Sequence, residues 1–123
     1  MNFNGILIGS EDPKRLADYY RKLFGEPGWD DFGYTGWLIG SAGVTVGPHS
    51  EVHGRNAEPG RIIWNIETPD VLGEFERLKG AGATVVREPY TMDGAPEDSY
   101  IATFEDPDGN YFQLMSPMDP SVM

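Results

Sequence analysis

Apolar residues in the first part of the chain change from a strand pattern to a helical one. Residues 3–8 form a short apolar run. Asp12 and Pro13 then supply an N-cap and a first helical residue, because proline lacks the N–H that this position leaves unpaired. The apolar positions that follow have the i, i+3, i+4, i+7, i+8 spacing of one helix face: Leu16, Tyr19, Tyr20, Leu23 and Phe24. This pattern predicts a strand followed by an amphipathic helix that ends at Gly25.

The second half of the chain repeats this pattern. An apolar run at 62–66 precedes a proline-containing cap at 68–70, and helical spacing continues through Val71, Leu72, Phe75 and Leu78 to Gly80 and Gly82. Leu16 and Leu72 are 56 residues apart, as are Tyr19 and Phe75, which indicates an internal repeat.

Shorter runs with strand character follow each helix. In the first half they are 33–39 and 43–46, with 29–31 as the weakest candidate, and in the second half they are 84–86, 100–104 and 111–115. The segments 47–60 and 87–98 are rich in Gly, Pro and charge and are predicted to be loops. The sequence therefore predicts an α+β fold with tandem βαβββ repeats.

The chain length of 123 residues fits a single domain. We expect one domain over 1–123, with a first repeat at 1–55, a second at 60–117 and a tail at 118–123. Each repeat alone is small for burying a sheet and a helix well.

Composition excludes several classes of function. Nine Lys and Arg against twenty Asp and Glu give a net charge of −11, so nucleic acid and anionic membranes are not expected partners. The absence of Cys excludes a disulfide framework, a thiolate zinc site and a Cys nucleophile. No apolar stretch is long enough for a membrane span, and the N-terminus has no signal-peptide pattern. We expect a cytoplasmic protein.

One motif connects the repeat pattern to a known family. Residues 106–110 read Asp-Pro-Asp-Gly-Asn between two strand-like runs, which is a turn signal, and Tyr-Phe-Gln-Leu follows. As the last hairpin of a second βαβββ repeat, this segment resembles a signature of the vicinal oxygen chelate superfamily, which includes glyoxalase I, bleomycin-resistance proteins and extradiol dioxygenases. The cap at 10–13 and the helix ends at 19–25 and 78–83 extend the resemblance over nearly the whole chain.

The resemblance implies a curved mixed sheet with helices on its convex face, a concave cup for the ligand, and a homodimer. In the metal-dependent branches, His and Glu side chains from the first and last strands of each repeat hold a divalent ion. The corresponding positions here are Gly5, Thr45, Arg61 or Ile63, and Gln113. Glycine and isoleucine offer no ligand, and Gln113 offers a carbonyl oxygen without charge. We therefore expect no metal and no cofactor at this site.

Alternation along the strands predicts which residues face the cup, because positions two apart share a face. One face is uniformly apolar and suits the helices: Ile6, Ile8, Val44, Val46, Ile62, Trp64, Ile66, Phe112 and Leu114. The other face mixes small, aromatic and amide residues, which predicts a pocket for a small, partly apolar organic molecule. Its expected ligand-binding residues, with the aromatic loop 32–37 and Tyr100 as walls, are Gln113, Asn65, Tyr111, Thr45, Trp37, Leu7, Ile63 and Met115.

Other interpretations remain open. Gln113 and Asn65 could pair with each other or with buried water, with Trp37 and Tyr34 as core residues. The chain could be a lyase, an isomerase or a dioxygenase-like enzyme whose metal uses substituted ligands that include Gln113, or a non-enzymatic partner module. Its acidity and aromatic content also fit sequestration of a cationic aromatic compound, as in the bleomycin-resistance branch. Catalytic residues are not identified.

The two histidines of the chain form a separate candidate. His49, Glu51 and His53 would project from one face of a strand with metal-compatible chemistry. Gly and Pro before them and Gly after them favour a loop instead, in which the three side chains point in different directions.

Overall fold

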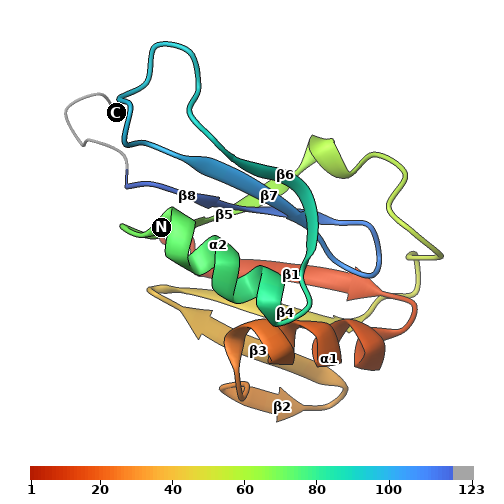
Figure 1. Cartoon of the computed structure of the whole chain (residues 1–123). Coiled ribbons are helices and arrows are strands. Elements are labelled where there is room, and N and C mark those ends of the chain that lie inside the picture. The colour runs from red at the N-terminus through yellow and green to blue at the C-terminus, as the bar shows by residue number, and fades with distance from the viewer. Residues whose placement is uncertain (118–123) are drawn as a thin grey trace. The chain divides into compact units, whose positions relative to one another are not determined.

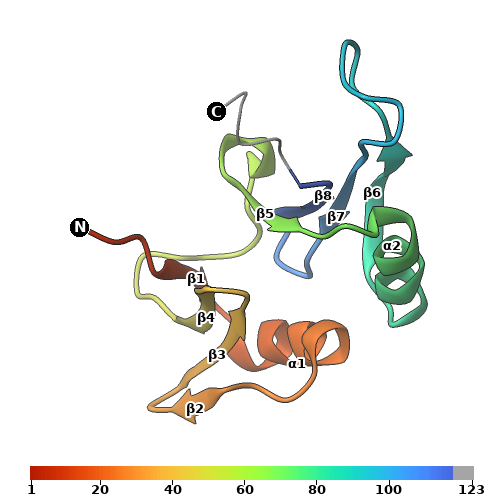
Figure 2. The same ribbon diagram turned by 90° about the vertical axis from the view of Figure 1, so that its left-hand side faces the viewer.

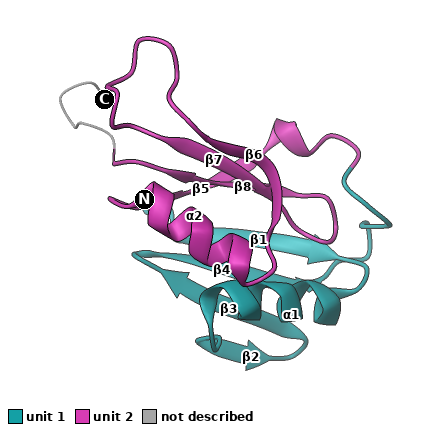
Figure 3. Cartoon of the chain, viewed as in Figure 1, with its two compact units in different colours: residues 1–56 teal, residues 57–123 magenta. Residues whose placement is uncertain are grey.

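The computed structural model describes residues 1–117 and contains two compact units, residues 1–56 and 57–123 (Figure 3). Each unit has the order strand, helix and three strands, and each forms its own four-stranded mixed sheet. The predicted α+β fold of tandem βαβββ repeats is confirmed. The expected tail at 118–123 lies outside the described residues.

The first unit consists of β1 (Gly5–Ser10), α1 (Pro13–Phe24), β2 (Trp29–Asp31), β3 (Tyr34–Ile39) and β4 (Ala42–Pro48). The sheet order is β1-β4-β3-β2, with β1 parallel to β4 and the other pairs antiparallel. The crossover through α1 is what allows β1 and β4 to run in the same direction. Figure 2 shows α1 on one side of its own sheet.

Local sequence signals set the limits of α1. The carboxylate of Asp12 accepts a hydrogen bond from the N–H of Arg15 at 3.3 Å, and Pro13 occupies the first turn. The helix ends at Gly25, which has a φ of 85° and donates its N–H to the Arg21 carbonyl at 2.9 Å. The buried face of α1, with the sheet residues beneath it, forms the core of this unit: Leu16, Ala17, Tyr20, Leu23, Trp37, Val44 and Val46.

The second unit begins with a 3-10 turn, Pro59–Arg61, followed by β5 (Ile63–Glu67), α2 (Val71–Gly80), β6 (Thr84–Tyr90), β7 (Ile101–Glu105) and β8 (Tyr111–Met115). The sheet order is β5-β8-β7-β6, again with one parallel pair, β5 and β8 (Figure 1). Asp70 caps α2 by accepting the N–H of Gly73 at 3.0 Å.

An aromatic stack fills the core of the second unit. The ring of Phe104 stacks on those of Phe75 and Phe112, with centroids 5.4 Å apart in both pairs, and Phe112 stacks on Trp64 at 5.2 Å. Such offset pairs contribute about 1 kcal/mol each beyond the area they bury. The stack therefore fixes α2 against one face of its sheet.

Three expectations need correction. Strand β6 continues to Tyr90, although 87–98 was expected to be a loop; β6 is an edge strand, where Pro89 removes no required ladder hydrogen bond. Ile62 precedes β5 and is 78% exposed, so it does not belong to the helix-facing set. Leu16 is fully buried whereas Leu72 is half exposed, so these two leucines are not equivalent positions of the repeat.

In the part of the chain described, no helix is both long and apolar enough to cross a bilayer.

Candidate functional site

The sheet face opposite α1 in the first unit is built largely of glycine. Gly5 is paired with Gly43, and Gly36 is paired with Thr45, which lies two positions from both Gly43 and Gly47. These four glycines therefore share one face. A Cβ at Gly36 would overlap the Trp29 ring, and one at Gly43 would lie 3.2 Å from it. The indole of Trp29 therefore reaches from edge strand β2 across the backbone of β3 towards β4.

A pocket of about 290 Å³ lies beside this indole. It is lined by Trp29 together with Asn4, Gly5, Ile6, Leu7, Gly43 and Thr45. Leu7 and Thr45 are neighbours across the parallel β1–β4 pair, and Leu7 is 55% exposed. The lining combines apolar surface with one hydroxyl and one amide, which is the usual composition of a small-molecule site.

The second unit carries side chains where the first carries glycine. On the face opposite α2, one row across the four strands consists of Asn65, Gln113, Thr103 and Arg87. The next row contains Met115, Ile101 and Tyr90, with Glu67 at its end. This face thus presents a row of hydrogen-bonding groups beside a largely apolar row.

One hydrogen bond fixes the centre of the polar row. The amide nitrogen of Gln113 donates to Oγ1 of Thr103 at 3.1 Å, and Thr103 is 6% exposed. The hydroxyl hydrogen of Thr103 and the carbonyl oxygen of Gln113 remain available for other partners. Gln113 pairs with Thr103 and, within the described residues, not with Asn65.

The Asp-Pro-Asp-Gly-Asn turn sets the register that places these side chains. The buried carboxylate of Asp106 accepts the backbone N–H groups of Asp108 at 2.9 Å and Asn110 at 3.0 Å, and also the Asn110 side-chain amide at 3.0 Å. A one-residue slip would move every side chain of β8 to the opposite face. The motif therefore acts structurally, by holding Tyr111, Gln113 and Met115 on the open face.

The structure brings together two groups of the predicted site residues. Leu7 and Thr45 are neighbours in the first unit, and in the second unit Asn65 is paired with Gln113 and Ile63 with Tyr111, with Met115 on the same face. The expectation for Trp37 is wrong. It is paired with Val44 on the helix side, its ring centroid lies 6.3 Å from that of Tyr20, and its Nε1–H donates to the Gly25 carbonyl at 2.9 Å.

The positions where the superfamily carries metal ligands lie on these open faces. By the resemblance these are Gly5, Thr45, Arg61 or Ile63, and Gln113; Arg61 belongs to the 3-10 turn before β5, and the other four lie in the strands. These four offer one hydroxyl and one amide and no charged ligand. Nδ1 of His49 accepts the backbone N–H of Glu51 at 3.2 Å, which occupies one nitrogen of the His49–Glu51–His53 candidate. No group of three His, Cys, Asp or Glu suited to a metal occurs within residues 1–117.

Sequence reasoning missed Asn4, Trp29, Thr103 and Arg87. Trp29 belongs to the weakest strand candidate. The signal for its position was Gly36, which lies between the larger residues Tyr34 and Leu38 on the same face of β3 and leaves room for the ring. Arg87 was missed because it is followed by Glu88 and Pro89, so this segment was predicted to be a loop.

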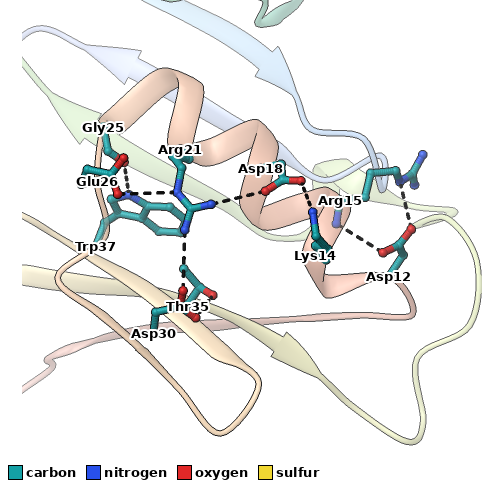
Figure 4. Close-up of polar contacts among 10 residues, drawn as sticks. All are labelled: Asp12, Lys14, Arg15, Asp18, Arg21, Gly25, Glu26, Asp30, Thr35 and Trp37. Carbon is teal, nitrogen blue, oxygen red and sulfur yellow. Dashed lines mark hydrogen bonds and ion pairs between the residues drawn. The ribbon is translucent and has the colours of Figure 1, made fainter.

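A second pocket in the first unit, of about 320 Å³, lies on the helix side and is lined in part by the charged side chains of Lys14, Asp18, Arg21 and Asp30 (Figure 4). Asp18 accepts from Lys14 at 2.9 Å and from Arg21 at 3.4 Å, and Arg21 also lies 3.7 Å from Asp30. The Lys14 hydrogen bond, with the nearby positive charges, lowers the pKa of Asp18. These charges are paired with each other, so the network links α1 to β2.

Comparison with known proteins agrees with this architecture. A family model described as a glyoxalase-like domain matches residues 5–115. No curated protein sequence matches the chain.

Solved structures match over nearly their full length. A glyoxalase/bleomycin resistance protein/dioxygenase family enzyme from Burkholderia phytofirmans PsJN is 18% identical, with a TM-score of 0.72 over 96% of this chain and 100% of that chain. A glyoxalase-related enzyme from Fulvimarina pelagi is also 18% identical, with a TM-score of 0.73 over 98% and 94%. A superfamily member from Sphaerobacter thermophilus DSM 20745 is 19% identical, with a TM-score of 0.72 over 95% and 98%. At these identities the likeness concerns the fold.

Proposed function

The chain belongs to the glyoxalase-like domain family, and from that premise we propose that it is a cytoplasmic protein that binds a small, partly apolar organic molecule on its open sheet faces without a metal. The observation that carries the proposal is the pocket beside Trp29, whose floor is glycine backbone. A flat aromatic wall over a bare backbone suits a planar, partly apolar ligand.

The donor set of the open faces supports binding without a metal. Thr45 and Gln113 stand where charged ligands would be needed, and the Gln113 amide nitrogen is already engaged with Thr103. A neutral hydroxyl and amide hold a divalent ion weakly but orient an organic ligand well, because each can donate and accept hydrogen bonds. The predicted ligand-binding set, without Trp37, remains our proposal: Leu7, Thr45, Ile63, Asn65, Tyr111, Gln113 and Met115.

The proposal can be tested with indole as a planar probe. We expect indole to raise the melting temperature of the purified protein and to shift the backbone amide NMR signals of Leu7 and Thr45, since a ligand that binds only the folded state stabilises it. Trp29→Ala should remove both effects by opening the pocket wall. Phe32→Ala is the matched control, because Phe32 is an aromatic residue of the adjacent turn that does not line the pocket.

Two outcomes would contradict the proposal. One is an indole response that persists unchanged in Trp29→Ala. The other is stabilisation by Mn²⁺, Ni²⁺, Zn²⁺ or Fe²⁺ salts in the absence of any response to indole, which would favour the metal-dependent lyase or isomerase.

We further propose that the chain forms a homodimer. The presence of large apolar side chains at the surface supports this, since Phe3, Leu38 and Ile62 are each more than half exposed. Light scattering coupled to size-exclusion chromatography should give twice the chain mass of 13.6 kDa, and the mass of one chain would contradict the proposal.

A further inference from the structure

Arg87 lies on the open face of the second unit because of an irregularity in β6. Val85 is paired with Phe104 of the core, and after a register shift Arg87 is paired with Thr103 on the opposite face. A second shift follows, and Tyr90 is paired with Ile101 on that same face. The two shifts place an arginine and a tyrosine together at the edge of the sheet.

The Tyr90 ring holds the guanidinium in a defined position. The Cζ atom of Arg87 lies 3.5 Å from the ring centroid, which is a close cation–π contact. A guanidinium bound by its flat face keeps the N–H groups at its edge free, and these match the two oxygens of a carboxylate. Stacking also reduces the rotamer freedom that Arg87 would lose on binding.

No carboxylate within residues 57–117 forms an ion pair with Arg87. Arg61 pairs with Glu58 at 2.6 Å and Arg77 with Glu74 at 2.7 Å, while the Lys79 ammonium lies over the Phe75 ring. Arg87 makes no ion pair within the described residues 57–117. It is therefore a cation on the open face that can accept an external anion.

The surroundings of Arg87 restrict the kind of anion. The polar row ends at Arg87, and beside it lies the apolar row of Tyr90, Ile101 and Met115. Glu67 and Glu105 also belong to this face and repel any anion, so one negative charge can be offset by Arg87 but a second one could not. A ligand with one carboxylate and an apolar body matches this arrangement.

We propose that the open face of the second unit selects a monocarboxylic acid with an aromatic or aliphatic body, whose carboxylate binds the guanidinium edge of Arg87 while its body lies along Ile101 and Met115. The inference rests on the proposed function, since it names the ligand class for one of the faces assigned there.

Three probes with the same ring and different charge test the inference: benzoate, benzamide and benzylamine. Backbone amide NMR signals of Thr103 and Gln113 report binding to this face, and low ionic strength limits screening of the exposed guanidinium. We expect benzoate to bind about tenfold more tightly than benzamide, which corresponds to about 1.4 kcal/mol, and benzylamine to bind most weakly.

Variants assign the preference to Arg87. Arg87→Met keeps a long apolar side chain against Tyr90 and should make benzoate and benzamide equal. Arg87→Lys keeps the charge but not the planar fork, and should retain only part of the preference. Arg77→Met is the matched control, because it removes the same charge from a paired arginine on α2 and should leave the preference intact.

The outcomes separate the two proposals. Equal binding of benzoate and benzamide, a preference for benzylamine, or an unchanged preference in Arg87→Met would overturn the inference and leave the proposed function standing. Absence of any response at Thr103 and Gln113 to all three probes would overturn both for this face.

Discussion

The two units use one scaffold to build different open faces. The same row of four strand positions holds Leu7, Thr45, Gly36 and Trp29 in the first unit, and Asn65, Gln113, Thr103 and Arg87 in the second. In the first unit the edge-strand residue is an indole that lies over glycine. In the second it is a guanidinium stacked on Tyr90, beside hydrogen-bonded side chains.

This difference shows where the two halves diverge. The helix-facing sides of both sheets are apolar and packed, because each must cover its own helix. The open sides have no such requirement, so one is flat and aromatic, and the other is polar and carries Arg87, which has no ion pair among residues 57–117. The edge strands β2 and β6 supply the residue that gives each face its chemistry.

The largest effect is expected from a substitution at Gly36, whose missing side chain leaves room for the Trp29 indole in the first unit. Gly36→Ala puts a methyl group where the Trp29 ring lies, so the ring must leave the face. We expect a loss of about 1–2 kcal/mol in the free energy of unfolding and a large shift of the Trp29 indole N–H NMR signal, identified by its absence in Trp29→Phe.

The counterpart in the second unit is Thr103→Ala, which removes the acceptor of the Gln113 amide. It should cost about 1 kcal/mol in the free energy of unfolding without moving any aromatic ring.

The control for Gly36→Ala is Gly60→Ala, since no atom beyond its chain neighbours lies within 4 Å of the added carbon. An unshifted Trp29 signal in Gly36→Ala would show that the glycine does not shape this face.

A smaller, stabilising effect is expected at the turn that follows β2, the strand of Trp29. The turn between β2 and β3 places Phe32 at a φ of 56° with its side chain 97% exposed, a conformation that costs a bulky residue about 1–2 kcal/mol. Phe32→Asn should raise the free energy of unfolding by about 0.5–1 kcal/mol, because Asn tolerates this conformation and little burial is lost. Thermal unfolding measures the change, and a lower melting temperature would assign Phe32 a packing role.

The smallest expected effect is on pH dependence, and it concerns the first unit. The pKa of Asp18 is lowered by Lys14 in the folded state, so its ion pairs stabilise the fold above the pKa that Asp18 has in the unfolded chain. This contribution is lost as pH falls through the lower folded-state pKa. Asp18→Asn should therefore reduce stability near neutral pH and match the parent protein only at a pH below the lowered folded-state pKa of Asp18, as urea midpoints will show.

The control for this effect is Glu74→Gln on α2. Glu74 pairs with Arg77 within one helix, whereas the Asp18 network also connects α1 to β2 through Arg21 and Asp30. The two variants should differ, with Asp18→Asn the more pH-sensitive. Equal pH profiles would mean that the network of the first unit adds nothing to an ordinary helical ion pair.

Most of the fold could be predicted from the sequence because its signals were local. Asp12 with Pro13, Asp70, and the turn at 106–110 each fix an element boundary through hydrogen bonds to nearby backbone. Period-two alternation then assigned the faces of β1, β4, β5 and β8 correctly, since their registers are pinned by these turns and caps.

The edge strands escaped prediction for physical reasons. Strand β2 has three residues, all exposed, so it leaves no hydrophobic period. Strand β6 contains Pro89 and two register shifts, which break the alternation that would have placed Arg87 and Tyr90. Trp37 was misplaced because an aromatic residue in a glycine-rich strand fits either face, and only the pairing with Val44 decides. Of the site residues that were missed, Trp29 and Arg87 lie on these edge strands. Thr103 lies on β7, and Asn4 precedes β1.

The most direct test of the central claim is the affinity for indole with and without metal. The dissociation constant would be measured by calorimetry on protein treated with EDTA, and again after adding Mn²⁺, Ni²⁺, Zn²⁺ or Fe²⁺ in turn. We predict the same dissociation constant in every case. Binding that appears only with one of the metals would contradict the account.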